Sequence, residues 1–227
     1  IKNRFAGGKP AIEMPVAILL QAVERLVGTT SFSSYASFVR HPDIAKMLQI
    51  KNETLQVLDD YSKQLVPEFV DATTWHVPDK KFRDIALLVS LHKQVFDLLQ
   101  TCISLQQSKA DINTCTAAIR DLLLVVYGGD TLDRTDPKLV SLEKVFAIID
   151  TFDAISEHVS GQLGHIDIAT VIHLLVSILE QATIPEYPNS EAIETVGWLE
   201  SMVVDAPCLI VVGMSADLIG GNNPGDM

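Results

Sequence analysis

The sequence predicts a mainly α-helical protein, a bundle of about eight helices bracketed by a few β-strands at the two ends of the chain. Apolar residues recur at helical spacing through almost the whole interior of the chain. Residues 208–213 differ from this helical pattern, because they form a short run of aliphatic and β-branched residues that follows Pro207 and ends at Gly213. Such a run is typical of a strand that a parallel sheet buries on both faces. Its best partners within the chain are then residues 11–14 and 193–196, which flank the helical block, or its neighbours lie outside the chain.

Composition restricts the class of protein. The chain has 227 residues, of which 48% are hydrophobic and 20% charged, so it can bury a sizeable core. A net charge of -12 argues against a surface broadly suited to nucleic acid. Three distant cysteines offer no disulfide framework, which favours a reducing cytoplasm. No apolar run reaches the ~18–20 residues of a membrane span, and no signal peptide is evident, so we expect no membrane contact.

The first third of the chain predicts short helices joined by turns. Residues 11–14 suggest a short strand, and Pro15 then suits the first turn of a helix that Gly28 should end. Ser31 is a good helix N-cap. The segment His41-Pro42-Asp43 interrupts the helical pattern, because a residue before proline avoids the α region. The expected helices run over residues 15–27, 32–39 and 44–48, and from Asn52 or Glu53 to residue 65.

The middle of the chain predicts a bundle of longer helices. Asp111 should cap one of them, and Gly128-Gly129 should end it. The two prolines of residues 184–189 indicate an extended linker after the last helix. The expected helices run over residues 80–107, 111–127, 138–159 and 167–181.

No group of residues has the spacing of an active site. His158, His165 and His173 are too far apart for a helical zinc site. Asp130, Asp133 and Asp136 lack the alternate-residue spacing of a calcium loop. His92 and His173 lie among apolar helix positions and should be core or boundary residues, and Cys102, Cys115 and Cys208 should be inert packing residues. No Gly-rich phosphate loop is present, so we expect no catalytic residue, cofactor or metal.

Three segments, taken in this order, resemble a known protein family. The sequence resembles the C-terminal helicase region of inactivated superfamily I helicases, the B-subunit-like proteins of AddAB/RecBCD-type helicase–nucleases. The segments are Gly8-Lys9-Pro10 with Met14-Pro15 and Leu19-Leu20, then Phe38-Val39-Arg40-His41-Pro42-Asp43-Ile44, and then Val196-Gly197-Trp198-Leu199-Glu200 with residues 205–213. After Gly213 the family has Leu-Asn-Glu-Gly, whereas this chain has Met214-Ser215-Ala216-Asp217.

The resemblance implies a helical insertion, subdomain 2B, within a RecA-like half-domain, subdomain 2A. Residues 1–30 would begin the RecA-like part, residues 31–184 would form the insertion, and residues 185–227 would return to the RecA-like part. The parent protein would carry a helicase-like domain before this region and a PD-(D/E)XK nuclease domain after it. Arg40, His41, Trp198, Glu200 and Gly213 are the residues that the resemblance would place near DNA or a partner.

We therefore expect a fragment of an ATPase-inactive, helicase-like DNA-repair protein, a scaffold within a helicase–nuclease that processes double-strand DNA ends. Its partners would be the rest of the parent chain, a partner subunit, and DNA through the parent, with weak DNA binding by the fragment alone. The alternative is a free-standing α-helical protein-interaction module. A small hydrolase using Asp/His pairs ranks last, because no constellation supports it.

Overall fold

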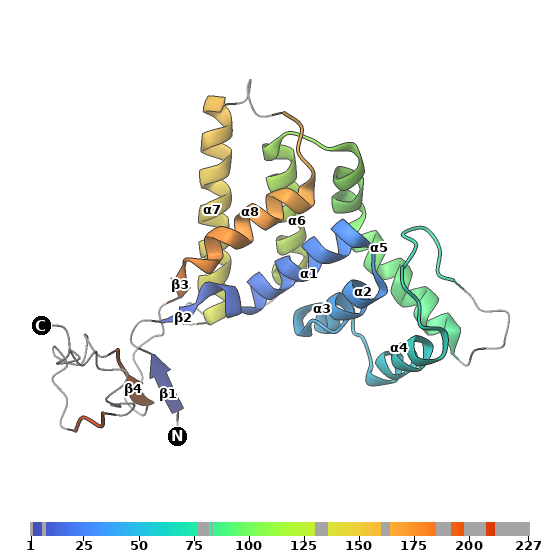
Figure 1. Ribbon diagram of the computed structural model, residues 1–227, viewed down its shortest axis with the longest axis horizontal. Helices are drawn as coiled ribbons and strands as arrows, with labels where there is room; N and C mark the ends of the chain where they lie inside the picture. Colours follow the sequence, from blue (N-terminus) through green and yellow to red (C-terminus); the bar gives the residue numbers. More distant parts are fainter. Residues whose placement is uncertain are drawn as a thin grey trace, which may run out of the picture.

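The computed structural model describes residues 2–5, 8–76, 82, 84–129, 136–159, 164–184, 192–197 and 208–211. Within these residues the fold is mainly helical, as predicted (Figure 1). The α-helices are α1 (Pro15–Thr29), α2 (Phe32–Val39), α3 (Pro42–Met47), α4 (Asn52–Leu65), α5 (Ile85–Ser108), α6 (Ile112–Tyr127), α7 (Pro137–Val159) and α8 (Ile168–Glu180). The remaining elements are the strands β1 (Lys2–Phe5), β2 (Lys9–Pro10), β3 (Thr183–Ile184) and β4 (Ala192–Thr195), and the 3-10 helix η1 (Ala11–Glu13).

The two ends of the chain meet through two pairs of strands. Of the three segments predicted as strands there, only residues 193–196 overlap a described strand, β4. Strand β1 pairs with β4 in parallel, with Lys2 opposite Ala192. Strand β2 pairs with β3 in antiparallel fashion, with Lys9 opposite Ile184. Figure 1 shows β1 and β4 outside the helical body, and β2 and β3 where the chain enters and leaves that body. We call the β2–β3 pair the neck. Both sheets of the described residues have two strands each, so a RecA-like half-domain is not confirmed.

The strand predicted at residues 208–213 is not found in the part of it that is described. Residues 208–211 have no regular structure, and the side chains of Leu209, Ile210 and Val211 are 52%, 80% and 55% exposed. An apolar run is buried only where other elements cover it, and no described element covers this one. Val212 and Gly213 lie outside the described residues.

The strand predicted at residues 11–14 is also wrong, since η1 occupies this segment. The backbone N–H of Ala11 donates to the carbonyl of Ala182 at 2.9 Å, and that of Met14 turns back to the carbonyl of Ala11 at 3.2 Å. These bonds satisfy the backbone without a ladder of strands. The turn aims the chain from the neck directly into α1.

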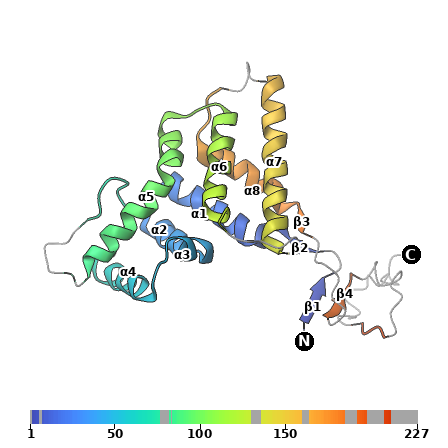
Figure 2. The same ribbon diagram turned by 180° about the vertical axis from the view of Figure 1, so that it is seen from behind.

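The core of the helical body is centred on α1 and α8, which lie side by side and run in opposite directions (Figures 1 and 2). Helix α7 packs against both helices of this pair, α6 packs against α7 and α8, and α5 reaches from α6 to α4. The side chains at the centre are fully buried and almost all aliphatic, so burial of apolar area stabilises the body. They include Val16, Leu19, Leu20 and Val23 of α1, Ile119 and Leu123 of α6, and Val171, Ile172 and Leu175 of α8.

Most predicted helix ends are confirmed. The side chains of Ser31, Asp111 and Asp167 accept hydrogen bonds from backbone N–H groups in the first turns of α2, α6 and α8. Helix α1, however, continues past Gly28 to Thr29, and its C-cap residue is Thr30, whose φ is 49°. Helix α5 begins at Ile85 rather than at residue 80. None of the described helices is long and apolar enough to cross a membrane.

Candidate functional site

The His-Pro turn lies at the centre of a buried polar cluster. His41 is the N-cap of α3, and its Nδ1 accepts a hydrogen bond from the backbone N–H of Asp43 at 3.3 Å. Its Nε2 lies 3.0 Å from the carbonyl oxygen of Pro15, at the start of α1. One ring nitrogen therefore accepts and the other donates. This geometry requires a neutral imidazole with its proton on Nε2.

Asp43 extends the cluster to two further helices. The hydroxyl of Tyr127, at the end of α6, donates to Oδ2 of Asp43 at 2.8 Å. The ammonium of Lys138, at the start of α7, forms an ion pair with Oδ1. Together, His41 and Asp43 connect α3 to α1, α6 and α7. Both side chains are buried, so each polar contact replaces water that folding removes.

The cluster shifts the pKa of both groups downward. Burial lowers the pKa of His41, which outweighs the hydrogen bond to Pro15 and the charge of Asp43. Burial alone would raise the pKa of Asp43, but the hydrogen bonds from Lys138 and Tyr127 and the charge of Lys138 hold it below its usual range. At neutral pH the cluster therefore holds a neutral imidazole beside an ionised carboxylate. The cluster joins four helices, so its hydrogen bonds and its ion pair have a structural role.

The other residues that were expected to lie near DNA or a partner fall into two groups. Arg40, next to His41, forms an ion pair with Asp59 of α4 and donates from Nη1 to the carbonyl of Ala36 at 3.0 Å. It thereby connects α2 to α4. Trp198, Glu200 and Gly213 lie outside the described residues.

The remaining ionisable residues do not converge. His92 is buried, as predicted, but His173 is exposed and bonds Glu24 at 3.0 Å. Among the described residues no group of three or more His, Cys, Asp or Glu side chains could hold a metal ion.

The cysteines also differ from one another. Cys102 and Cys115 are buried, as predicted, and burial raises their pKa to about 12 and about 11. Cys208 is exposed, so its predicted place on a buried strand is wrong.

An aromatic cluster joins α2, α4, α5 and the segment after α4. The rings of Tyr61 and Trp75 have centroids 4.9 Å apart, and those of His92 and Phe96 are 4.5 Å apart. Phe32, Tyr35 and Tyr61 lie on the buried faces of α2 and α4, but nothing in the local sequence shows that they meet. The rings of the cluster belong to Phe32, Tyr35, Tyr61, Trp75, Phe82, His92 and Phe96.

Hydrogen bonds hold the segment after α4 over this cluster. The backbone N–H of Phe32 donates to the carbonyl of Glu68 at 2.9 Å, and that of Val70 donates to the carbonyl of Thr30 at 2.8 Å. The Nε2–H of His92 donates to the carbonyl of Asp71 at 2.7 Å. The segment is therefore fixed to both α2 and α5, although it has no regular structure of its own.

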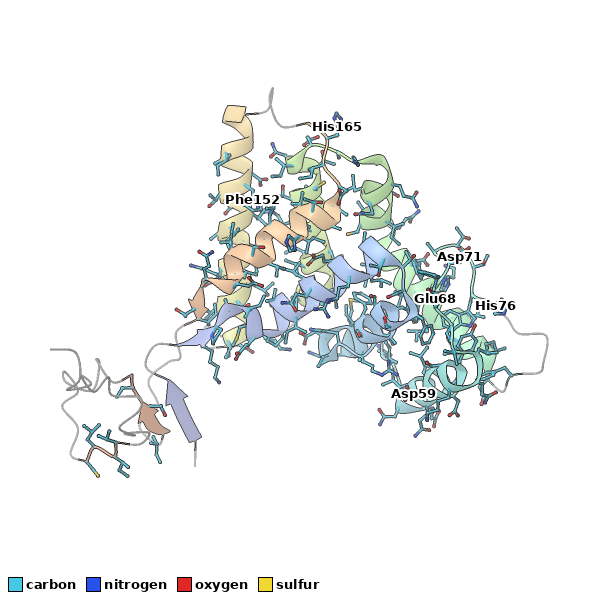
Figure 3. The ribbon with its side chains drawn as sticks, viewed as in Figure 1. Asp59, Glu68, Asp71, His76, Phe152 and His165 are labelled. Carbon is cyan, nitrogen blue, oxygen red and sulfur yellow. The ribbon has the colours of Figure 1, made fainter. Side chains whose placement is uncertain are left out.

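An open groove of about 470 Å³ lies over the aromatic cluster. Phe32, Tyr61, Phe69 and Trp75 supply its aromatic lining, and Asp71 its carboxylate. Figure 3 shows Glu68, Asp71 and His76 at the α4–α5 end of the molecule, on the opposite side of the body from Phe152. We call this feature the aromatic groove. A second groove of about 690 Å³ lies nearby, between α4 and the start of α5.

The region around the aromatic groove includes several unfavourable features. Val66 is β-branched and 79% exposed, yet its φ is 45° and its ψ 53°, which costs roughly 1–2 kcal/mol for an L-residue. The hydroxyl of Tyr35 and the Nε1 of Trp75 are buried without a hydrogen-bond partner among the described residues. Each such group costs ~1–3 kcal/mol. Local strain of this kind gathers at functional sites, which marks the groove as a candidate.

No family model matches this chain, and no curated protein or solved structure matches it either. The features that bear on function are therefore those of the molecule itself: the strand pairs at its ends, the His-Pro cluster and the aromatic groove.

Proposed function

We propose that this chain is a helical insertion in the helicase-like region of an ATPase-inactive DNA-repair protein. It would serve as a scaffold within a helicase–nuclease that processes double-strand DNA ends. The observation that carries the proposal is the parallel pairing of β1 with β4. Two parallel strands need a crossover connection, which is usually a single helix. Here the crossover contains the entire helical body.

The neck supports an insertion in particular. Because β2 and β3 pair in antiparallel fashion, the chain enters and leaves the body at one point. The body between them has its own core, from Ala11 through to Ile184. A module of this form can be added to a parallel sheet without separating the two strands that it interrupts.

The segments of the family resemblance fit this arrangement. The first covers β2 and the start of α1, at the point where the chain enters the body. The second is the His-Pro turn, which joins four helices of the body. The third begins directly after β4, where the chain returns to the parallel pair.

The catalytic parts of the proposed helicase–nuclease would lie in the parent protein and its partner subunit. The sequence contains no phosphate-binding loop, so ATP would be bound elsewhere. Cleavage of DNA would belong to a PD-(D/E)XK domain of the parent.

The second candidate function is a free-standing protein-interaction module. The aromatic groove favours it, because aromatic side chains are enriched where proteins bind partners. In this alternative β1 and β4 would close the body without belonging to a larger sheet.

The proposal is tested on the natural full-length protein with its partner subunit. Residues 9–184 are replaced by a short Gly-Ser loop, and degradation of linear duplex DNA is compared with that by the intact protein. We expect the loop variant to lose DNA-end processing while the parent's sheet still folds, as judged by circular dichroism. Unchanged processing, or a full reading frame without PD-(D/E)XK residues, would contradict the proposal and favour the interaction module.

A further inference from the structure

We propose that the aromatic groove is a docking site for a basic, apolar peptide segment of a partner protein. The segment would present Arg or Lys side chains interleaved with aliphatic ones. This inference does not depend on the proposed function, because the groove would serve an insertion and a free-standing module equally.

Apolar side chains are exposed along one edge of the groove, which Pro67 and Phe69 line and which Leu65 and Val66 precede in the chain. Val66 and Phe69 are 79% and 62% exposed, and Leu65, just before them, is 38% exposed. They follow one another at the end of α4 and in the segment after it. Clusters of exposed apolar side chains with a polar rim mark interaction sites. The aliphatic part of the proposed peptide would cover this edge.

The wall of the groove is already in place. The segment is tied to α2 through the backbone bonds of Phe32 and Val70, and to α5 through His92. Tyr61 also donates from its hydroxyl to the carbonyl of His76 at 2.8 Å. A preformed site loses little conformational entropy when a ligand binds. An extended peptide could therefore bind without refolding this region.

The charge of the groove selects a basic partner. Asp71 is its only lining carboxylate, no Lys or Arg lines it among the described residues, and exposed Glu68 lies beside Phe69. Oδ1 of Asp71 accepts bonds from the hydroxyl and N–H of Thr73 and from the N–H of Thr74. These bonds lower the pKa of Asp71, so it is ionised at neutral pH. Aromatic faces add attraction for a cation.

The chain segment around the groove is also negatively charged, which disfavours the binding of nucleic acid. Residues 53–76 contain five carboxylates and one lysine, Lys63. Phosphate groups would be repelled, while an arginine could contact both the aromatic rings and a carboxylate. The partner is therefore expected to be a protein segment.

The test uses the whole chain and a fluorescein-labelled peptide of about twelve residues in which arginines alternate with leucines. Fluorescence anisotropy is measured at ~0.15 M salt, where long-range attraction is screened. We expect the peptide to bind, its glutamate-for-arginine counterpart not to bind, and Phe69→Ser to weaken binding at least tenfold. Leu124→Ser is the matched control, because Leu124 is a similarly exposed apolar residue on α6. It should leave the affinity unchanged.

A second pair of variants tests the charge without touching the apolar edge. Glu68→Gln should weaken binding severalfold, whereas Glu143→Gln on α7 should not. This pair also covers the case in which Phe69→Ser fails to fold. Equal effects of Phe69→Ser and Leu124→Ser would reveal only general attraction to an acidic protein and would overturn the proposal. A gain of affinity when Lys80, Lys81 and Arg83 are replaced by Ala would also overturn it, since the chain's own segment would then be the occupant.

Discussion

His41 gives the folded protein a defined response to acid. Protonation would place a second N–H on Nδ1, where the backbone N–H of Asp43 now donates. Burial lowers the pKa of His41 in the folded chain, so between that pKa and the ordinary value of 6.5 the unfolded chain binds more protons. The free energy of unfolding therefore rises as the pH increases through this window, and the contribution of His41 to stability is lost as the pH falls through it. Asp43 and Lys138 are the charged groups that face the ring.

We expect His41→Asn to flatten this dependence, because the asparagine oxygen can still cap α3 but cannot titrate. Thermal unfolding from pH 7.5 to pH 5.5 measures the effect. The control is His165→Asn, because His165 is exposed and lies outside the cluster, and this variant should keep the slope of the wild type. An unchanged slope in His41→Asn would assign the acid response to other groups.

Lys138→Met tests the ion pair at the centre of the cluster. The variant leaves the buried carboxylate of Asp43 with Tyr127 as its main partner, and we expect a loss of about 3 kcal/mol in the free energy of unfolding. Urea unfolding measures this loss. Lys93→Met is the matched control, because Lys93 forms a solvent-exposed ion pair with Asp97 at 2.7 Å. This variant should change the free energy of unfolding by less than about 0.5 kcal/mol. Similar losses in both variants would show that burial adds nothing to the Asp43 pair.

Single residues differ in how far the sequence predicts them. The interruption at His41-Pro42-Asp43 was predictable, because proline restricts the residue before it. The partners Pro15, Tyr127 and Lys138 were not, since they lie on other helices at separations that no local pattern encodes.

At the level of elements, Val66 at the end of α4 is the clearest departure from a preferred conformation. Its left-handed backbone is the one that glycine adopts without penalty. We expect Val66→Gly to raise the free energy of unfolding by about 1 kcal/mol, measured in urea. Gln64→Gly, inside the same helix, should lower it by roughly 0.5–1 kcal/mol instead. If both changes lower stability, Val66 is not strained.

The helices followed the sequence more closely than the strands did, for a physical reason. A helix satisfies its backbone locally, so a capping residue such as Asp111 and an apolar stripe suffice to define α6. A strand depends on a partner elsewhere in the chain. The apolar composition of residues 208–211 therefore indicated a buried strand, whereas β1 and β4, which are less conspicuous, are the segments that pair.

The aromatic groove was missed because it needs three distant segments. Trp75 and Phe69 lie in a stretch without periodicity, which gave no signal for either helix or strand. The useful clue would have been three large apolar residues, Phe69, Val70 and Trp75, in a segment otherwise rich in turn-forming residues.

For the molecule as a whole, net charge determines its behaviour toward DNA. With twelve excess negative charges, the chain should bind duplex DNA more weakly than about 100 nM at ~0.15 M salt in a gel-shift assay. Arg40, which precedes the His-Pro turn in the sequence, is already paired with Asp59. Lowering the salt should strengthen any residual binding. A tighter complex at ~0.15 M would contradict the charge argument.

The meeting of the chain ends was predicted at this scale, and so was a strand at residues 193–196, which overlaps β4, but its partner β1 was not. The prediction rested on the cost of unpaired backbone groups, which applies to any strand. It could not distinguish β1 from residues 11–14 as the partner, because both lie close to the neck.

The neck also makes the helical body transferable. Lys9 and Ile184 face each other across one pair of short strands, so the two ends of the body are a single strand spacing apart. A protein engineer could splice residues 9–184 into the hairpin of an unrelated host, whose own antiparallel strands would continue β2 and β3. The same closeness would allow a circular permutant that joins the ends with a short turn and opens the chain elsewhere.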